Sequence, residues 1–330
     1  MRLPLTSPLS PATHARHPPP LLCAPSSTVW ALDFDGVIVD SEPESTRAAW
    51  RAALELWPDI MEEAPSIDPR EAGVLRKWTG GSWDEMSKDA GDGMPGWLAA
   101  KVRQLRPVVE TGYENTLLMR LCVEEALSAK RGAGITGTRP LSAGEILASW
   151  DGDYRDYLLA RYKVSAEHMV DHYGGIRDEW MDTDLASWIA ANRYYPGAPA
   201  AVRDALAAGS TVYIVTTKQQ RFAQALLKAA GVVLPNECVF GLGSGPKPDT
   251  LAELQARHAG AELAFLEDKV ETLVKVARDM RLLPVSLHFA EWGYSTPQQQ
   301  AIAASLPRVR SHAYSDALGP LMLGTGKEAV

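Results

Sequence analysis

Hydrophobic residues follow two different patterns along the chain, and the change between them divides it into two parts. From Glu42 to about Tyr195, apolar residues recur at helical spacing and no strand pattern is evident. Loops rich in glycine and proline interrupt this block at 91–96 and 132–141. The helices that the spacing predicts are Ser45–Trp57, Tyr113–Ala129, Ala143–Trp150, Tyr154–Tyr162 and Thr183–Ala191.

Beyond Tyr195, short apolar runs alternate with amphipathic segments, which predicts βαβ units and a parallel sheet. An earlier apolar run, Val29–Leu32, has no other strand to pair with and is therefore placed in the same sheet. The predicted strands and helices are Thr211–Val215, Cys238–Phe240, Leu263–Leu266 and Pro284–Phe289, with helices at Ala198–Ala208, Arg221–Ala230, Pro248–His258 and Glu271–Met280.

The predicted fold class is therefore α/β: a Rossmann-like core with a parallel sheet flanked by helices, and an inserted all-α cap. The core spans 29–44 and 195–330, and the cap spans 45–194. Because the cap interrupts the chain after the first strand, we expect it to lie over the carboxyl ends of the strands, where ligands bind in open α/β sheets.

Composition narrows the function classes. The chain has 330 residues and a net charge of −8, which argues against nonspecific nucleic-acid binding. No apolar stretch approaches the length needed to span a membrane. The three cysteines are scattered, with neither a disulfide framework nor zinc spacing, which indicates a reducing compartment. Nothing in the pattern indicates an oligomeric state.

Residues 1–28 differ in composition from the rest. They contain Arg2 and Arg16, are rich in proline, and precede Asp33, which is the first acidic residue of the chain. Such a segment is typical of organelle transit peptides, and Pro18-Pro19-Pro20 would break the helix of a mitochondrial presequence. Plastid targeting is therefore expected; the alternative is a disordered extension on a cytoplasmic protein.

Four segments at the carboxyl ends of predicted strands, or just beyond them, carry polar side chains that a parallel sheet would bring to one edge. The first of these segments carries two carboxylates one residue apart, Asp33 and Asp35, which are costly to bury unless a cation lies between them. Carboxylates, a hydroxyl and an ammonium at one edge suit phosphoryl transfer assisted by a divalent cation. The segments are Asp33-Phe34-Asp35-Gly36, Thr216-Thr217-Lys218, Gly245-Pro246-Lys247-Pro248 and Glu267-Asp268.

These segments resemble the four motifs of the haloacid dehalogenase-like hydrolase superfamily, in its helical-cap branch with phosphoglycolate phosphatase and β-phosphoglucomutase. The matching stretches are D-F-D-G-V-I-V-D-S, I-V-T-T-K, G-P-K-P-D-T-L and F-L-E-D-K-V-E-T-L, followed by A-E-W-G-Y. The resemblance covers roughly residues 29–44 and 195–295.

The resemblance implies a role for each matching position. Asp33 would attack phosphorus and form an aspartyl-phosphate, and Asp35 would act as acid and then as base. Thr216 and Lys247 would bind the phosphoryl oxygens. Gly36 would help to cradle them, and Thr217 is a neighbouring substrate-binding candidate.

The implied cofactor is Mg²⁺, held by Asp33, the backbone carbonyl of Asp35, and Asp268. Many relatives have glycine directly before the aspartate that corresponds to Asp268, and a second acidic residue four positions after it. Here those positions are Glu267 and Thr272. Glu267 is therefore a further metal-ligand candidate, and Glu271 is an alternative support for Asp268.

Several cap residues have two interpretations. Arg106 either binds a second anionic group of the substrate or lies on the surface. His168 and His172 have the i, i+4 spacing of a zinc pair but no evident third ligand. The tryptophans between Trp50 and Trp188 either line a pocket or pack the cap. Lys130 and Arg131 are weaker anion-binding candidates.

The favoured function is a Mg²⁺-dependent phosphatase acting on a small phosphorylated metabolite, with no nucleic-acid or membrane partner. One alternative is a sugar phosphomutase, which shares all four motifs. The other is a non-catalytic binding protein on the same scaffold.

Overall fold

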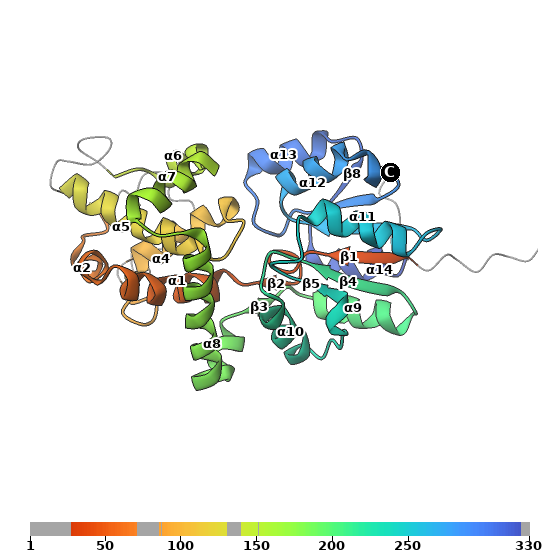
Figure 1. Cartoon of the computed structure of the whole chain (residues 1–330), viewed down its shortest axis with the longest axis horizontal. Coiled ribbons are helices and arrows are strands. Elements are labelled where there is room, and N and C mark those ends of the chain that lie inside the picture. Colours follow the sequence, from red (N-terminus) through yellow and green to blue (C-terminus); the bar gives the residue numbers. More distant parts are fainter. Residues whose placement is uncertain (1–27, 71–85, 87, 131–139, 151, 325–330) are drawn as a thin grey trace, which may run out of the picture.

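The computed structural model shows two packed units joined by two short linkers (Figure 1). The residues that it describes are 28–70, 86, 88–130, 140–150 and 152–324. The predicted N-terminal extension, except for its last residue, lies outside these ranges, as does Arg131. Among the described helices, none combines the length and the apolar character needed to cross a bilayer.

The first unit is built on a six-stranded sheet in which every neighbouring pair is parallel. The strand order is β5-β4-β1-β6-β7-β8. The bounds are β1 Val29–Leu32, β4 Thr211–Val215, β5 Val239–Phe240, β6 Leu263–Glu267, β7 Ser286–Ala290 and β8 Val309–His312. In the middle of the sheet, Val29 of β1 pairs with Thr211 on one side and Leu263 on the other. The predicted parallel sheet is confirmed.

Side chains of the central strands alternate between two helical layers. Trp30 and Leu32 pack into one cluster with α9, α10 and α14, whereas Val29 and Ala31 pack into another with α11, α12 and α13. This burial on both faces explains why the strands are short, continuous apolar runs. The helices are α9 Ala198–Ala207, α10 Gln220–Ala229, α11 Lys247–Arg257, α12 Val270–Arg278, α13 Pro297–Ser305 and α14 Leu318–Met322, with short 3-10 turns η3 Asn236–Cys238, η4 Met280–Leu282 and η5 Ser315–Ala317.

The second unit is helical and has a hydrophobic cluster of its own. Helices α1, α4, α5 and α8 pack against one another through it. It forms the inserted cap, and the predicted fold class is confirmed. Its elements are α1 Glu42–Leu56, α2 Pro58–Met61, η1 Ala64–Ser66, α4 Gly96–Leu105, η2 Arg106–Val108, α5 Glu114–Lys130, α6 Ala143–Ser149, α7 Gly152–Tyr162 and α8 Ala166–Ala190.

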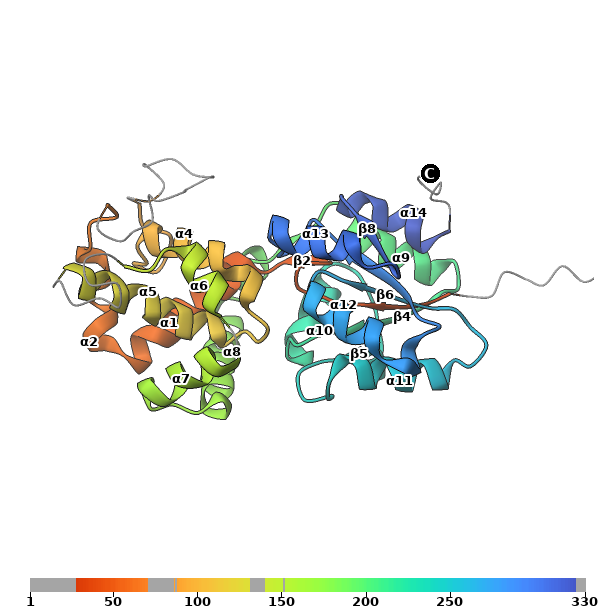
Figure 2. The same cartoon turned by 90° about the horizontal axis from the view of Figure 1, so that it is seen from above.

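Two short strands carry the chain into and out of the cap. Strand β2, Val39–Asp40, pairs antiparallel with β3, Arg193–Tyr194. Seen from above, β2 runs between the two units (Figure 2). The pattern of the helical block did not predict β3, because a two-residue strand leaves no detectable alternation.

Candidate active site

The carboxyl ends of three neighbouring strands bring the predicted polar residues together. Asp33 follows β1, Thr216 follows β4 and Asp268 follows β6. The backbone N–H of Asp33 donates to the carbonyl of Leu266, and that of Thr216 donates to the carbonyl of Phe240. Sheet hydrogen bonding therefore extends to the first residue beyond two of these strands and fixes where their side chains start.

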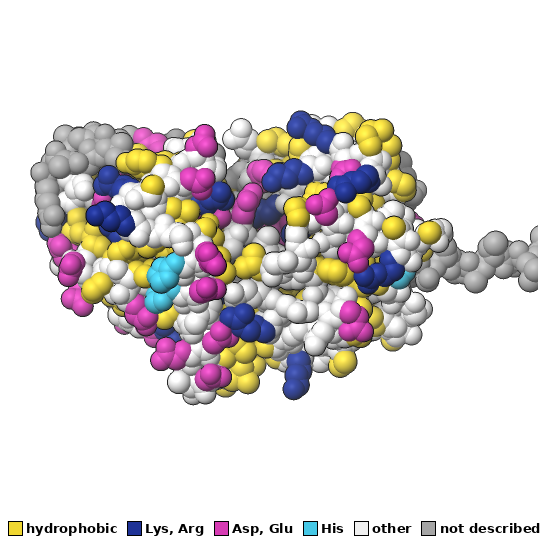
Figure 3. Space-filling model, viewed as in Figure 1, with side chains coloured by type: hydrophobic (Ala, Val, Ile, Leu, Met, Phe, Trp, Pro, Cys, Tyr) yellow, Lys and Arg dark blue, Asp and Glu magenta, His cyan; other side chains and the backbone are white. Residues whose placement is uncertain are grey.

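A cavity of about 610 Å³ lies over these strand ends, between the core and the cap. Figure 3 shows the molecule hollowed between the two units, where acidic and basic side chains meet. Such a volume accommodates a small metabolite. Predicted site residues in its lining are Asp33, Asp35, Arg106, Thr216, Thr217, Lys247 and Asp268.

Lys247 lies between two carboxylates. Its Nζ is 3.0 Å from Asp33 Oδ1 and 2.7 Å from Glu267 Oε2. Burial alone would lower the pKa of Lys247, but Asp33 and Glu267 outweigh it and raise that pKa above its ordinary value. The residue begins α11 between Pro246 and Pro248, whose rings restrict the backbone at the helix start. The result is a fixed, fully charged ammonium beside the proposed nucleophile.

Three of the acidic residues that were predicted to bind the metal lie close together. One carboxylate oxygen from each of Asp33, Glu267 and Asp268 lies within 4.8 Å of the others. Burial is the main cause that raises the pKa of both Glu267 and Asp268, and Asp33 adds repulsion in each case. Such crowding of carboxylates is relieved by a divalent cation, for which oxygen atoms are the preferred ligands.

The hydrogen bonds of these carboxylates separate their roles. Asp268 Oδ2 accepts from the backbone N–H of Tyr294 at 2.7 Å, whereas its buried Oδ1 has no hydrogen-bond partner. Glu267 Oε1 accepts from the N–H groups of Asp268 and Lys269, and its Oε2 accepts from Lys247. Asp268 therefore has an oxygen available to a cation, whereas Glu267 has both oxygens occupied and serves best as the anchor of Lys247.

Glycine is required where the backbone approaches Asp268. Gly36 has φ +87°, and a Cβ built there would lie 2.0 Å from Asp268 Oδ2. A Cβ on Gly293 would lie 2.4 Å from Asp268 Cβ and 2.5 Å from the carbonyl oxygen of Gly36. Two glycines thus let the two motif loops close around one carboxylate.

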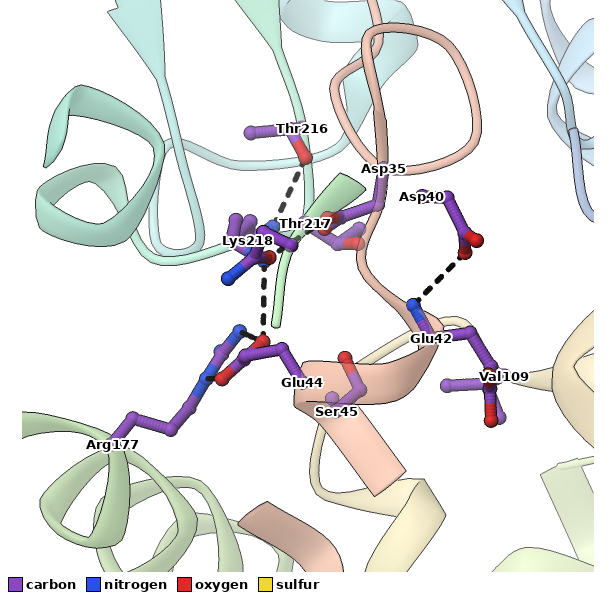
Figure 4. A network of polar contacts seen from close by, with 12 residues as sticks. Asp35, Asp40, Glu42, Glu44, Ser45, Val109, Arg177, Thr216, Thr217 and Lys218 are labelled. Atoms are coloured by element: carbon purple, nitrogen blue, oxygen red, sulfur yellow. Dashed lines mark hydrogen bonds and ion pairs between the residues drawn. The ribbon is translucent and has the colours of Figure 1, made fainter. Parts of the chain in front are cut away.

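Asp35 has an ion-pair partner that the sequence did not single out. Lys218 Nζ donates to Asp35 Oδ1 at 3.0 Å (Figure 4). Burial alone would raise the pKa of Asp35, but Lys218 and Arg106 outweigh it, so that this pKa lies below its ordinary value. The signal was present in Thr216-Thr217-Lys218, where the lysine is the third residue after a predicted strand.

The two threonines have different contacts. Thr216 is buried, lines the cavity, and its Oγ1 accepts from the backbone N–H of Lys218 at 3.1 Å. Thr217 is exposed, and its hydroxyl donates to the carbonyl of Glu110 in the cap at 2.7 Å. Thr217 therefore lies at the interface between core and cap and links them through this hydrogen bond.

Arg106 is buried at the cap side of the cavity, with 8% of its surface exposed. Its guanidinium lies 4.0 Å from the ring centroid of Tyr294, and its Nη1 donates to the carbonyl of Val109 at 3.3 Å. Its Nε has no hydrogen-bond partner, and no carboxylate of the described residues lies within ion-pair distance. A buried cation without a carboxylate partner leaves room for an anionic ligand.

Among the other described cap candidates, Trp150 alone lines the cavity. His168 and His172 stack on each other along α8, and among the residues that the structure describes they belong to no group of three metal ligands. Lys130 is exposed at the end of α5. Of the described tryptophans, Trp150 lines the cavity, whereas Trp50, Trp97 and Trp188 are buried in the packing. Glu271, the alternative support for Asp268, accepts instead from Gln299 Nε2.

Comparison with known proteins gives likenesses among solved structures. No protein-family model matches the chain. No curated protein matches it either. The chain is similar to a predicted phosphoglycolate phosphatase from Haemophilus somnus, at 12% identity and TM-score 0.46, covering 90% of this chain and 97% of that one.

Two further solved structures are similar at comparable levels. A predicted phosphatase from Clostridium acetobutylicum shows 13% identity and TM-score 0.46, over 91% of this chain and 100% of that one. A haloacid dehalogenase-like hydrolase from Streptococcus pneumoniae shows 12% identity and TM-score 0.41, over 90% and 98%. The fold described above does not depend on these likenesses, because it follows from the strand order and the inserted helices.

Proposed function

We propose that this protein is a Mg²⁺-dependent phosphatase that hydrolyses a small phosphomonoester through an aspartyl-phosphate. The observation that supports this most is the meeting of Asp33, Asp35, Lys247 and Asp268 around one cavity beneath a cap. These residues come from segments more than two hundred positions apart in the chain. Their convergence supplies a nucleophile, an acid/base, a cation and a metal ligand in one place.

In the first step, a carboxylate oxygen of Asp33 attacks phosphorus. A new bond forms between that oxygen and phosphorus, while the bond from phosphorus to the leaving oxygen breaks. Asp35 donates a proton to the leaving oxygen, which departs as an alcohol. This proton comes from the substrate, which binds as a monoanion. The negative charge of its phosphoryl group raises the pKa of Asp35, so that Asp35 takes up the proton.

In the second step, Asp35 accepts a proton from water as the water oxygen attacks the phosphorus of the aspartyl-phosphate. The bond between phosphorus and Asp33 breaks, and Asp35 passes its proton to the phosphate, which leaves as H₂PO₄⁻. Both carboxyl groups are then ionised again, as at the start. Lys247, Thr216 and the backbone N–H groups around Gly36 stabilise charge on the phosphoryl oxygens throughout.

A bound Mg²⁺ would neutralise phosphoryl charge next to the nucleophile. Asp33 and Asp268 would hold it, together with the backbone carbonyl of Asp35. The buried Asp268 Oδ1 without a hydrogen-bond partner supports this placement. Glu267 remains a candidate ligand, although its contacts support the role of anchoring Lys247.

The position of Arg106 indicates the kind of leaving group that the substrate carries. Its guanidinium lines the cavity without a carboxylate partner, so we infer a substrate whose leaving group carries a second anionic group. Replacing Arg106 with methionine should raise KM for such substrates by about 10- to 100-fold, because it removes a charge-assisted hydrogen bond in a buried site. The measurement compares KM for phosphomonoesters with an anionic leaving group against KM for p-nitrophenyl phosphate, which should change by less than about threefold.

Arg120 provides a matched control for this experiment. Like that of Arg106, its guanidinium lies over aromatic rings, in this case those of Trp57 and Tyr162 in the cap. Arg120 is absent from the cavity lining. Arg120→Met should therefore leave both KM values unchanged. Equal increases for both substrate types in Arg106→Met would contradict a role in recognising the leaving group.

The phosphatase itself is tested on the full chain with a broad panel of phosphomonoesters in the presence of Mg²⁺. Release of inorganic phosphate is the expected result. Conversion of a sugar phosphate into its isomer without phosphate release would instead indicate the phosphomutase. Absence of turnover across the panel would favour the non-catalytic binding protein.

Plastid targeting by residues 1–28 remains a proposal that the composition of this segment supports. It is tested by fusing these residues to a fluorescent protein. Retention of the fusion in the cytoplasm would contradict it.

A further inference from the structure

A line of alternating charges runs from the cap to Asp35. Arg177 donates from Nε and Nη2 to the two carboxylate oxygens of Glu44, at 2.6 and 2.5 Å. Lys218 Nζ lies 3.9 Å from Glu44 Oε2 and 3.0 Å from Asp35 Oδ1. Figure 4 shows Lys218 between the two carboxylates, with Arg177 behind Glu44.

Three of the four groups are held firmly because they are buried. Glu44 is fully buried, and Arg177 and Lys218 are nearly so. Trp188 Nε1 donates to Glu44 Oε1 at 3.0 Å, so both oxygens of Glu44 have fixed donors. Buried charges of this kind persist only when each faces an opposite charge in good geometry. Removing one member therefore disturbs its neighbours.

The line crosses the boundary between the two units. Glu44 lies in the first turn of α1 and Arg177 lies on α8, both in the cap. Asp35 and Lys218 follow the core strands β1 and β4, and the backbone N–H of Lys218 is fixed by Thr216 Oγ1. Lys218 thus contacts one carboxylate from each unit.

We propose that Glu44 and Arg177 make Lys218 a positioning residue, which orients the carboxyl group of Asp35 toward the leaving oxygen when the cap is closed. This inference rests on the proposed phosphatase. Lys218 holds one oxygen of Asp35 and so restricts the rotation of its carboxyl group. Glu44 keeps the ammonium in place from the cap side. The cap thereby completes the acid/base arrangement on closing.

If Lys218 positions Asp35, the loss of activity on replacing Lys218 depends on the leaving group of the substrate. If Lys218 only holds the cap in place, the loss does not depend on it. A poor leaving group, such as an alkoxide, needs proton donation from a well-placed acid. A good leaving group, such as p-nitrophenolate, departs with little help. A misplaced Asp35 therefore slows the first step selectively, whereas a loosened cap slows it for both kinds of substrate.

The test compares kcat/KM for an alkyl phosphate and for p-nitrophenyl phosphate, in the full chain with Mg²⁺. This ratio reports steps up to formation of the aspartyl-phosphate and so excludes its hydrolysis. Lys218→Met should lower kcat/KM about 10²-fold for the alkyl phosphate but less than about fivefold for p-nitrophenyl phosphate. Lys218→Arg should restore much of the loss, since it returns a donor and a positive charge.

Glu44→Gln provides the second variant, because Lys218→Met leaves the carboxylate of Asp35 without its ion-pair partner and can prevent folding. It should also lower kcat/KM more for the alkyl phosphate than for p-nitrophenyl phosphate, but by a smaller factor than Lys218→Met does. Asp178→Asn is the matched control: Asp178 on α8 pairs with Arg221 on α10, which joins cap to core without touching Asp35. It should leave the ratio between the two substrates unchanged.

Equal losses for both substrates in Lys218→Met or Glu44→Gln, or no loss, would overturn the positioning role while leaving the phosphatase intact. The same selective loss in Asp178→Asn would overturn it too, because any weakened cap contact would then suffice. A wild-type protein without activity on either substrate would sink the proposed function itself.

Discussion

Replacing Asp33 with asparagine is expected to lower phosphatase turnover by more than about 10³-fold, because an amide oxygen is a far weaker nucleophile than a carboxylate. The fold should survive, since asparagine has nearly the same shape. Asp33 also adds to the repulsion that raises the pKa of both Glu267 and Asp268. The thermal midpoint of Asp33→Asn should therefore equal or exceed that of the wild type.

The measurement is phosphate release from p-nitrophenyl phosphate, alongside thermal unfolding of the same preparations. Asp204→Asn is a suitable control, because Asp204 lies on the exposed side of α9. Retention of more than a few per cent of wild-type turnover in Asp33→Asn would remove Asp33 as the nucleophile.

Replacing Asp268 with asparagine should weaken Mg²⁺ binding by at least about tenfold, because it removes a buried anionic oxygen that has no other partner. The bond from the backbone N–H of Tyr294 can be kept by the amide oxygen. Binding is measured without turnover, as the Mg²⁺-dependent rise of the thermal midpoint. That rise should be present in the wild type and lost in Asp268→Asn at the same Mg²⁺ concentration.

The control for this experiment is Glu271→Gln, at the cavity rim, where Glu271 accepts a hydrogen bond from Gln299. Its Mg²⁺-dependent shift should match that of the wild type. If Asp268→Asn kept the full shift, the cation would have to bind elsewhere.

The sheet was predictable from the sequence because its strands are buried on both faces. Thr211–Val215 was predicted with the observed bounds, as a β-branched run between turns. Strand β8 was not predicted, because it lies at the sheet edge and its residues are half-buried or exposed. An edge strand pairs on one side only and needs no apolar run.

The cap was predicted less completely. Helix α4, Gly96–Leu105, was missed because its start lies in a loop rich in glycine and proline. Helix α8 is kinked at Asp184, where the backbone is not helical, and the predicted helix Thr183–Ala191 matches its second part. The first part, from Ala166, was not predicted, since Gly174-Gly175 interrupts the helical pattern. A Cβ on Gly174 would lie 3.0 Å from Gln219 Oε1 in the core. This glycine therefore marks a close approach between the two units, which a single sequence does not distinguish from a helix end.

The candidate site shows the same limit. Asp33, Asp35 and Lys247 were identifiable because each lies in a short motif near a predicted strand. Glu44 and Arg177 lie 133 positions apart, and no local pattern indicates that they meet. Long-range ion pairs of this kind depend on how the cap packs, which spacing along the chain does not reveal.

The pairing of β2 with β3 places the entry and the exit of the cap next to each other. Insertions or deletions between these strands therefore leave the register of the main sheet unaffected. A different cap inserted at these two positions would therefore leave Asp33, Lys247 and Asp268 of the core in place. It would have to supply its own counterparts of Glu44 and Arg177, which lie between β2 and β3.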